Sequence, residues 1–211
     1  MRLSPFILLL VLSAGCGDKS SPSGSSEPAS TSKTTATAPT SAPPAASSAP
    51  PAAPTGPLSD EWKETDVEGV ISLKLPGTPK KTSTDMPNPA GGKITTVLMF
   101  ATPSTGIPTV SVSVAKFPPG QKINAKGAFD GGRDNAVKAT SAKVVDEKDV
   151  KLGNNEGREF TLSNNSGGVA LLPRTRIYVI GQNLVTVALA SPEAQMKKDQ
   201  ADAFFDSIKA K

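Results

Sequence analysis

Apolar residues recur at every second position over much of the chain beyond residue 60, which is the period of a β-strand with one buried face. Residues 71–75 and 110–114 alternate strictly between aliphatic and polar side chains. Residues 94–101 are apolar on both sides at their centre, which predicts a central strand. Further strand-like stretches cover 144–152, 160–162, 169–180 and 184–190, separated by turns rich in Gly and Asn.

Two segments have the period of an α-helix instead. Residues 124–139 place apolar or small side chains along one stripe, although two adjacent glycines weaken it. Near the C-terminus, Ser191-Pro192 reads as a helix start, and Ala201, Phe204, Phe205 and Ile208 share one face. The order of three strands, a helix, four strands and a helix predicts an α+β fold with one antiparallel sheet of about six or seven strands.

The first fifteen residues have the layout of a secretory signal. Arg2 is followed by an apolar run over 6–12 and by three small residues before Cys16. The segment Leu12-Ser13-Ala14-Gly15-Cys16 resembles the lipobox of bacterial lipoproteins, with Ser13 where that family prefers an aliphatic residue. The resemblance implies cleavage of signal peptide 1–15 and attachment of lipid to the thiol of Cys16, the only cysteine in the chain.

Between this signal and the strand-forming region the composition changes completely. Residues 19–57 are mostly Pro, Ala, Ser and Thr, and they contain no Val, Ile, Leu or aromatic residue. Such a segment buries too little apolar surface to offset the chain entropy that folding would cost. We therefore expect 16–59 to be a lipidated cysteine followed by a disordered linker, and 60–211 to be one globular domain.

Several loose patterns in the domain resemble the PsbP-type α/β/α sandwich. They are a first strand ending in residues 73–79, the segment 157–160, a long strand with Arg176 and Tyr178, and a closing helix around 204–208. The resemblance implies this fold for about residues 66–209 and a location in the bacterial cell envelope. Relatives of this fold mostly act as binding or assembly accessories without a shared active site, so it assigns a role to no residue.

The composition excludes several kinds of chemistry. The chain has no histidine, the usual general base near neutral pH and the commonest ligand of transition metals. Its single thiol is assigned to lipid, which removes zinc–cysteine sites, thiol nucleophiles and disulfides. We therefore expect no cofactor and no bound metal. The basic residues are scattered and the chain has one Trp and one Tyr, so we expect no nucleic-acid binding.

One constellation is a candidate contact site. Alternation along residues 174–178 places two arginines and a tyrosine on one strand face, and a third arginine lies in a neighbouring strand. Together they fit a carboxylate, phosphate or polysaccharide ligand. The competing interpretation is a salt-bridged outer face with Glu156 and Glu159. The candidate ligand-contact residues are Arg158, Arg174, Arg176 and Tyr178.

These observations favour a non-catalytic binding or assembly accessory, held on a membrane of the cell envelope through Cys16. Gly17 in place of Asp favours the outer membrane over the inner one, if the cell has both. An envelope protein or polymer is the expected partner, and the sequence leaves the oligomeric state open. The alternatives are an enzyme that acts on envelope polymers without His or Cys, and a carrier of a small ligand or lipid. The enzyme requires titratable groups with opposed pKa shifts in one pocket, and the carrier requires a large apolar cavity.

Overall fold

The structure, a computed structural model, describes residues 62–103, 108–166, 169–192 and 198–211. The predicted signal peptide, Cys16 and the linker lie outside these residues, so their assignment stays a prediction. The strands are β1 (Trp62–Val67), β2 (Ile71–Pro76), β3 (Lys80–Pro87), β4 (Lys93–Ala101), β5 (Thr109–Lys116), β6 (Lys143–Leu152), β7 (Asn155–Ser166), β8 (Val169–Leu171), β9 (Arg174–Ile180), β10 (Asn183–Ala190) and β11 (Lys209–Ala210). The helices are α1 (Ala125–Thr140) and α2 (Lys198–Asp206).

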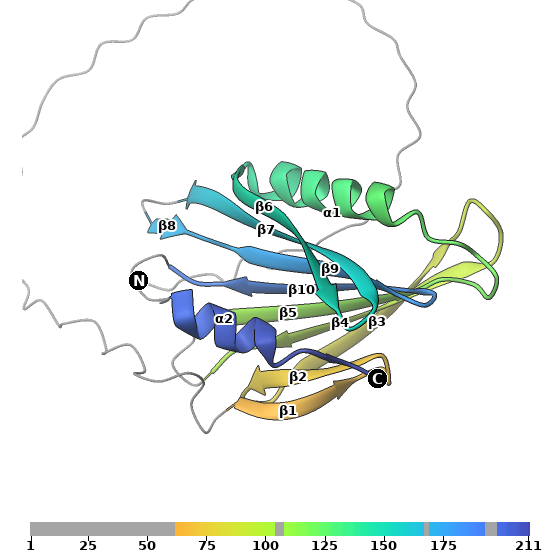
Figure 1. The fold of residues 1–211 in the computed structure, drawn as a ribbon, viewed down its shortest axis with the longest axis horizontal. Coiled ribbons are helices and arrows are strands. Elements are labelled where there is room, and N and C mark those ends of the chain that lie inside the picture. Colours follow the sequence, from red (N-terminus) through yellow and green to blue (C-terminus); the bar gives the residue numbers. More distant parts are fainter. Residues whose placement is uncertain (1–61, 104–107, 167–168, 193–197) are drawn as a thin grey trace, which may run out of the picture. The chain divides into compact units, whose positions relative to one another are not determined.

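Two antiparallel sheets organise the described residues (Figure 1). The large sheet has the strand order β3-β4-β5-β10-β9-β7-β6, with β8 paired to the end of β7. The small sheet has the order β1-β2-β11. Helix α1 packs on β7 and β9, whereas α2 and the small sheet cover the opposite face of the large sheet. The sequence prediction of an antiparallel α+β fold with two helices is confirmed.

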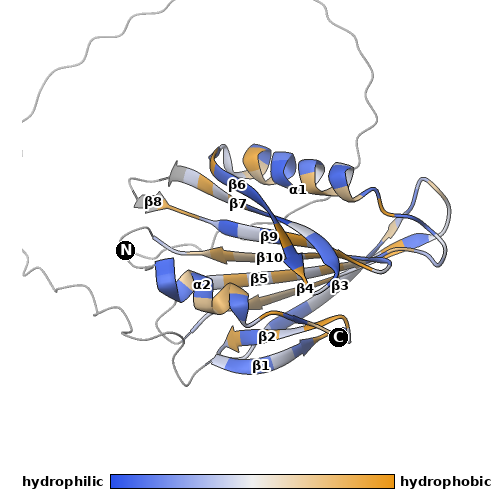
Figure 2. Cartoon of the chain, in the orientation of Figure 1, coloured by the Kyte–Doolittle hydropathy of each residue, from blue (hydrophilic) through white to orange (hydrophobic). Residues whose placement is uncertain are grey.

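The alternating side chains of the large sheet form two separate cores. Val110, Val112 and Val114 of β5 are fully buried and pack with Phe204 and Phe205 of α2. On the opposite face, sheet residues pack with Phe129 and Ala136 of α1; they are Phe160, Leu162, Ile177 and Leu184. Figure 2 shows how strongly the hydrophobic colour gathers on central strands β5 and β10. These central strands bury one face completely and the other partly, which explains why they read as more apolar than the edge strands.

Helix α1 owes its position to a cap and to a small residue. The side chain of Asn124 accepts a hydrogen bond from the backbone N–H of Gly127 (3.1 Å), which satisfies a donor of the first turn. A Cβ atom at Gly132 would lie 2.4 Å from Cδ1 of Ile177 in β9. The glycine therefore lets the helix approach the sheet, and the helix runs unbroken through the two glycines that weaken its sequence pattern.

The structure corrects the sequence prediction at several points. Residues 71–75 belong to the separate small sheet. Strands β1, β3 and β11 are not among the predicted strands, and β3 has no alternating pattern because it is an edge strand exposed on both faces. Pro173 divides the predicted strand 169–180 into β8 and β9, since proline donates no ladder hydrogen bond. Pro192 bridges to Leu171 and is therefore not the first residue of the last helix as predicted, and the described part of that helix begins at Lys198.

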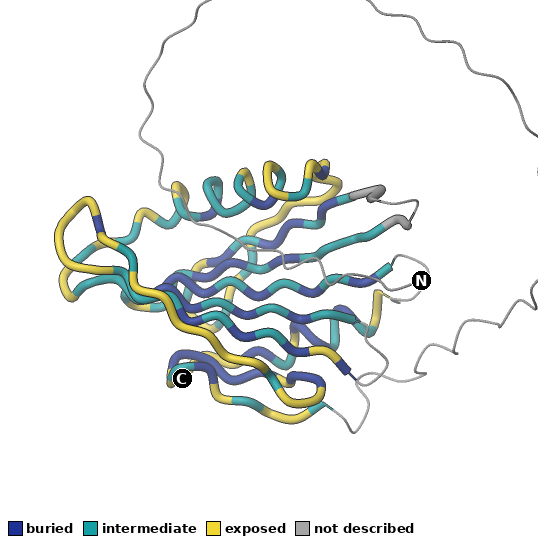
Figure 3. The backbone as a smooth tube through the Cα atoms, turned by 180° about the vertical axis from the view of Figure 1, so that it is seen from behind, coloured by how far each residue is buried: buried dark blue, intermediate teal, exposed yellow. Residues whose placement is uncertain are grey.

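The two edges of the large sheet are both polar. Six of the ten residues of strand β6 are charged, and its pairing with β7 is irregular between Val144 and Asp146. Strand β3 is exposed from Lys80 to Asp85, as the yellow tube in Figure 3 shows. No helix within the described residues is long and apolar enough to cross a membrane.

Candidate functional site

Two of the predicted contact residues, Arg174 and Arg176, lie on β9 beneath α2 and share one carboxylate. Arg174 Nε lies 2.9 Å from Glu159 Oε1, and Arg174 Nη2 donates to Oε2 (3.0 Å). Arg176 Nε donates to the same Oε2 at 2.5 Å. Glu159 lies opposite Arg176 in the β7–β9 register and is only 2% exposed. The three charges therefore form a buried, paired cluster instead of an open anion site.

Helix α2 closes this cluster from above. Arg174 Nη1 donates to Asp202 of α2 (2.5 Å), and Arg176 Nη1 donates to the carbonyl oxygen of Phe205 (3.3 Å). The guanidinium carbons lie 5.0 and 4.8 Å from the centroid of the Phe205 ring, within the range of cation–π attraction. The arginines thus fasten α2 to the sheet through charge, hydrogen bonds and ring contact together.

The pKa values agree with permanent ionisation of this cluster. Burial alone would raise the pKa of the Glu159 carboxyl, but hydrogen bonds from Arg174, Arg176 and Lys148 outweigh it and hold the pKa below its usual range. Burial opposes the charge of Arg174 too, yet Glu159 and Asp202 raise its pKa. Hydrogen bonding from Lys198, then from Arg174, lowers the pKa of Asp202 to about 2 despite partial burial. None of these three groups is poised to exchange a proton near neutral pH.

Tyr178 is packed into the core. It is 1% exposed, and burial raises the pKa of its phenol. Its ring covers Gly157, where a Cβ atom would lie 2.3 Å from Tyr178 Cδ1 and 2.7 Å from the carbonyl oxygen of Ile177. Glycine is therefore required at this point of β7 so that the ring fits, and Tyr178 offers a ligand little surface.

Arg158 points to the opposite face of the sheet, because it is next to Glu159 along β7 and side chains alternate between faces. Its guanidinium pairs with Asp149 of β6 (3.1 Å) and Asp130 of α1 (2.6 Å), and lies 5.6 Å from the ring of Phe129. The structure therefore does not bring the four predicted residues into one site. The salt-bridged alternative fits Glu159, whereas Glu156 makes no ion pair with any described residue.

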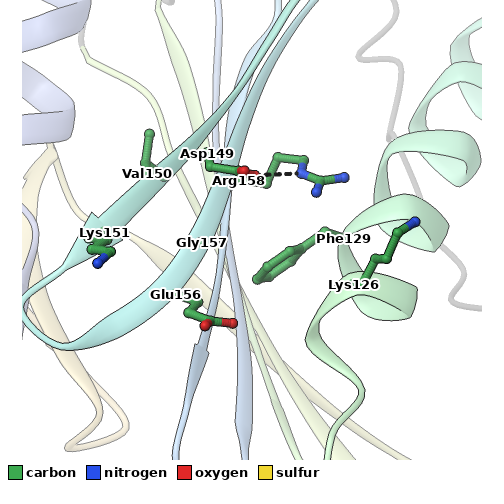
Figure 4. A pocket seen from close by; sticks show the side chains of 8 residues that line it. All are labelled: Lys126, Phe129, Asp149, Val150, Lys151, Glu156, Gly157 and Arg158. Atoms are coloured by element: carbon green, nitrogen blue, oxygen red, sulfur yellow. Dashed lines mark hydrogen bonds and ion pairs between the residues drawn. The ribbon is translucent and has the colours of Figure 1, made fainter.

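An open hollow of about 480 Å³ lies next to Arg158, between the first half of α1 and the β6–β7 hairpin (Figure 4). Figure 4 shows Phe129 pointing from the helix toward the strands, with Lys126 beside it on the outer side. The residues that line the hollow are Lys126, Phe129, Asp149, Val150, Lys151, Glu156, Gly157 and Arg158.

The rim of this hollow carries both signs of charge. Lys151 and Glu156 are opposite each other in the β6–β7 register, both are exposed, and neither makes an ion pair with a described residue. Arg158 and Asp149 are already paired to each other at the inner wall. The arrangement fits a polar ligand that carries donors and acceptors, since a free ammonium and a free carboxylate flank the opening. Within the described residues no group of three His, Cys, Asp or Glu side chains suits a metal ion.

The sequence held only a partial signal for this hollow. The Gly153-Asn154 turn fixes the hairpin and so places Lys151 opposite Glu156, which sequence reasoning could have derived. The contribution of Lys126 and Phe129 depends on how α1 crosses β7, and no local pattern encodes that crossing.

The comparisons with known proteins concern the fold. No protein-family model matches the chain, and no curated protein matches it in sequence. The solution structure of cyanobacterial PsbP (CyanoP) from Synechocystis sp. PCC 6803 is similar at 10% identity and a TM-score of 0.51, covering 77% of this chain and 100% of that one.

Two further structures overlap more loosely. LpqN of Mycobacterium tuberculosis, described as involved in cell envelope biogenesis, has 10% identity and a TM-score of 0.38 over 71% of this chain and 85% of its own. A Bacteroides thetaiotaomicron VPI-5482 protein has 16% identity and a TM-score of 0.42 over 72% of this chain and 49% of its own. These values add nothing beyond the fold. Together with the observed sheet and helices, the similarity to CyanoP shows that the described residues have the PsbP-like α+β fold.

Proposed function

We propose that this protein is a non-catalytic accessory of the cell envelope that binds a polar partner at the hollow between α1 and the β6–β7 hairpin. The observation that carries the proposal is the unpaired Lys151 and Glu156 at the rim of that hollow. Most other charges on this sheet face are already neutralised by ion pairs. A partner with groups of both signs would therefore meet its complementary charges here.

The anchoring part of the proposal rests on the sequence. Lipid on Cys16 would hold the domain at a membrane, because several acyl chains together make dissociation negligible whereas one chain gives only marginal binding. The Pro-rich residues 19–57 would then separate the domain from the membrane surface.

A non-catalytic role is supported by the state of the ionisable groups. Where a carboxyl pKa in the described residues departs clearly from its usual value, it is lowered, as for Glu68, Asp130 and Glu159. A general acid needs a raised carboxyl pKa next to a partner that stays ionised. The charges serve ion pairing, which suits a rigid binding surface.

Photo-crosslinking in living cells tests the binding site. A photoreactive residue in place of Lys151 in the full-length protein should trap a discrete envelope component. The same photoreactive residue in place of Lys74, which is exposed on the small sheet, should trap no such component. The double variant Lys151→Glu/Glu156→Lys should reduce trapping from a third rim position, Lys126, without changing the melting temperature. Equal trapping from Lys74, or turnover of an envelope polymer by the purified protein, would contradict the proposal.

Fatty-acid labelling tests the anchor separately. Cells grown with radiolabelled palmitate should label the parent protein, and Cys16→Ser should lose the label and the membrane association together. Persistence of the label in this variant would place the lipid elsewhere.

A further inference from the structure

The outer edge of β3 is an open strand edge. Among the described residues β3 pairs only with β4, so one row of its backbone N–H and C=O groups has no strand partner. Residues Lys80 to Asp85 are all exposed, so no other described element covers this edge (Figure 3). An unpaired edge of this kind is a template for a further strand.

The other edge of the sheet is protected in a way that β3 is not. Strand β6 has a register irregularity between Val144 and Asp146, and its centre, Asp146 to Asp149, consists entirely of charged residues. The centre of β3, Thr82-Ser83-Thr84, is uncharged and pairs regularly with β4. Bulges and dense charge discourage strand addition, so β3 is the edge that is open to it.

We propose that β3 pairs antiparallel with β3 of a second copy of this chain, around a two-fold axis that passes through Ser83. In such a pair, facing residues must lie on the same face of the continuous sheet, so the two facing residue numbers must have the same parity. The registers centred on Thr82, Ser83 and Thr84 meet this condition and keep the two strands overlapped.

Charge selects one of these three registers. Centring on Ser83 places Lys81 opposite Asp85 of the second copy, and the symmetry repeats this opposite-charge pair on the other side of the axis. Centring on Thr82 or on Thr84 pairs Lys81 with an uncharged residue instead. Lys81 already contacts Glu68, and Asp85 contacts Lys93 (2.7 Å) and Thr95 (2.6 Å), so these partners hold both side chains on the required face.

Cysteine cross-linking in cells that express the full-length protein tests this register. Facing residues have Cβ atoms about 4.5–5.5 Å apart, close to disulfide geometry after small adjustments. Ser83→Cys should therefore give a disulfide-linked dimer on mild oxidation. Thr82→Cys and Thr84→Cys should not do so singly, but should link to each other when the two are co-expressed. The parent chain, whose only cysteine is Cys16, gives the background of disulfide-linked dimer that forms without an introduced cysteine.

Charge variants in the Ser83→Cys background test the recognition. Lys81→Asp would place two carboxylates opposite each other, and Asp85→Lys would place two ammonium groups opposite each other. Each should lower the dimer yield at least about twofold, and the double exchange should restore it. Absence of the Ser83→Cys dimer, or an equal yield from Thr84→Cys alone, would overturn the proposal. If a charge variant does not fold, the difference in dimer yield between Ser83→Cys and the single variants Thr82→Cys and Thr84→Cys still tests the register.

Discussion

The two faces of the large sheet both carry an arginine-centred charge network, but the networks differ in burial. Beneath α2, Arg174 and Arg176 are 12% and 14% exposed at their side chains and share a carboxylate that is 2% exposed. On the other face, Arg158 of β7 and Arg133 of α1 share Glu147, whose side chain is 28% exposed. Because Arg158 is itself 18% exposed, the contrast between the networks lies mainly in the burial of the shared carboxylate.

The difference in burial between the two networks separates a face that attaches a helix to the sheet from a face that is open to a partner. A buried pair needs every partner, because the loss of one leaves a charge in a region of low dielectric. A half-exposed pair is screened by water and tolerates change. The α2 face is therefore a fixed junction between helix and sheet, whereas the α1 face keeps the hollow and its unpaired rim charges available.

The largest expected effect comes from Glu159→Gln, which removes the counter-charge of two buried arginines. We expect it to lower the free energy of unfolding by about 3–5 kcal/mol, measured by urea denaturation of the full-length protein. The matched change on the other face, Glu147→Gln, should cost about 0–1 kcal/mol. Equal losses for the two variants would remove the distinction between the faces.

A second contrast uses the two close-packed glycines. Gly157→Ala should cost about 1–3 kcal/mol or more, because its Cβ meets a ring and a carbonyl oxygen. Gly132→Ala meets only the flexible end of Ile177. Ile177→Val removes that end, so the double variant Gly132→Ala/Ile177→Val should regain stability relative to Gly132→Ala. Additive losses in this double-mutant cycle would show that the contact is not the cause.

Acid should weaken the α2 junction through Asp202. Its pKa is about 2 in the folded protein and near 3.9 in an unfolded chain, so the ionised form contributes stability above about pH 4. That contribution is lost as the pH falls from about 4 through 2.

Trp62, the only tryptophan, lies 5.6 Å from the Phe204 ring of α2 and reports unfolding by fluorescence. Asp202→Asn should cost about 1 kcal/mol or less at pH 7 and should flatten the pH dependence between pH 4 and 2. An unchanged slope would assign the acid sensitivity to other carboxyls.

The smallest losses of stability should come from ion pairs on the outer surfaces of the two helices, where we expect no difference between the α1 and α2 faces. Lys126 pairs with Asp130 on α1, and Lys198 pairs with Asp202 on α2, both at i,i+4 spacing and both through a largely exposed lysine. Lys126→Ala and Lys198→Ala should each cost about 0.3–0.5 kcal/mol in thermal or urea unfolding. A loss above about 1 kcal/mol for Lys198→Ala alone would show that Lys198 contributes to the buried charge cluster beneath α2.

Sequence reasoning predicted strand β5, whose two faces differ in burial, and did not predict β3, whose faces do not, although it did predict the exposed strand β6. Strand β5 alternates because one face is fully buried against the α2 side and the other is only partly buried, whereas β3 is exposed on both faces and leaves no pattern. The same alternation correctly placed Arg174 and Arg176 on one face. Arg158 does lie in the strand beside β9, as expected, but the alternation along β9 could not show which face of that strand carries it, because the register of β7 against β9 pairs residues that are distant in the chain.

The sequence by itself determined the alternation that builds an antiparallel α+β fold, the helical stripe of residues 124–139, and the absence of histidine chemistry. These depend on residues close together in the chain or on composition alone. Only the tertiary structure decided that Glu159 neutralises both arginines, that Arg158 serves the other face, and that Lys151 and Glu156 border a hollow. Burial and charge pairing are set by which elements pack together, and that packing is a property of the whole domain.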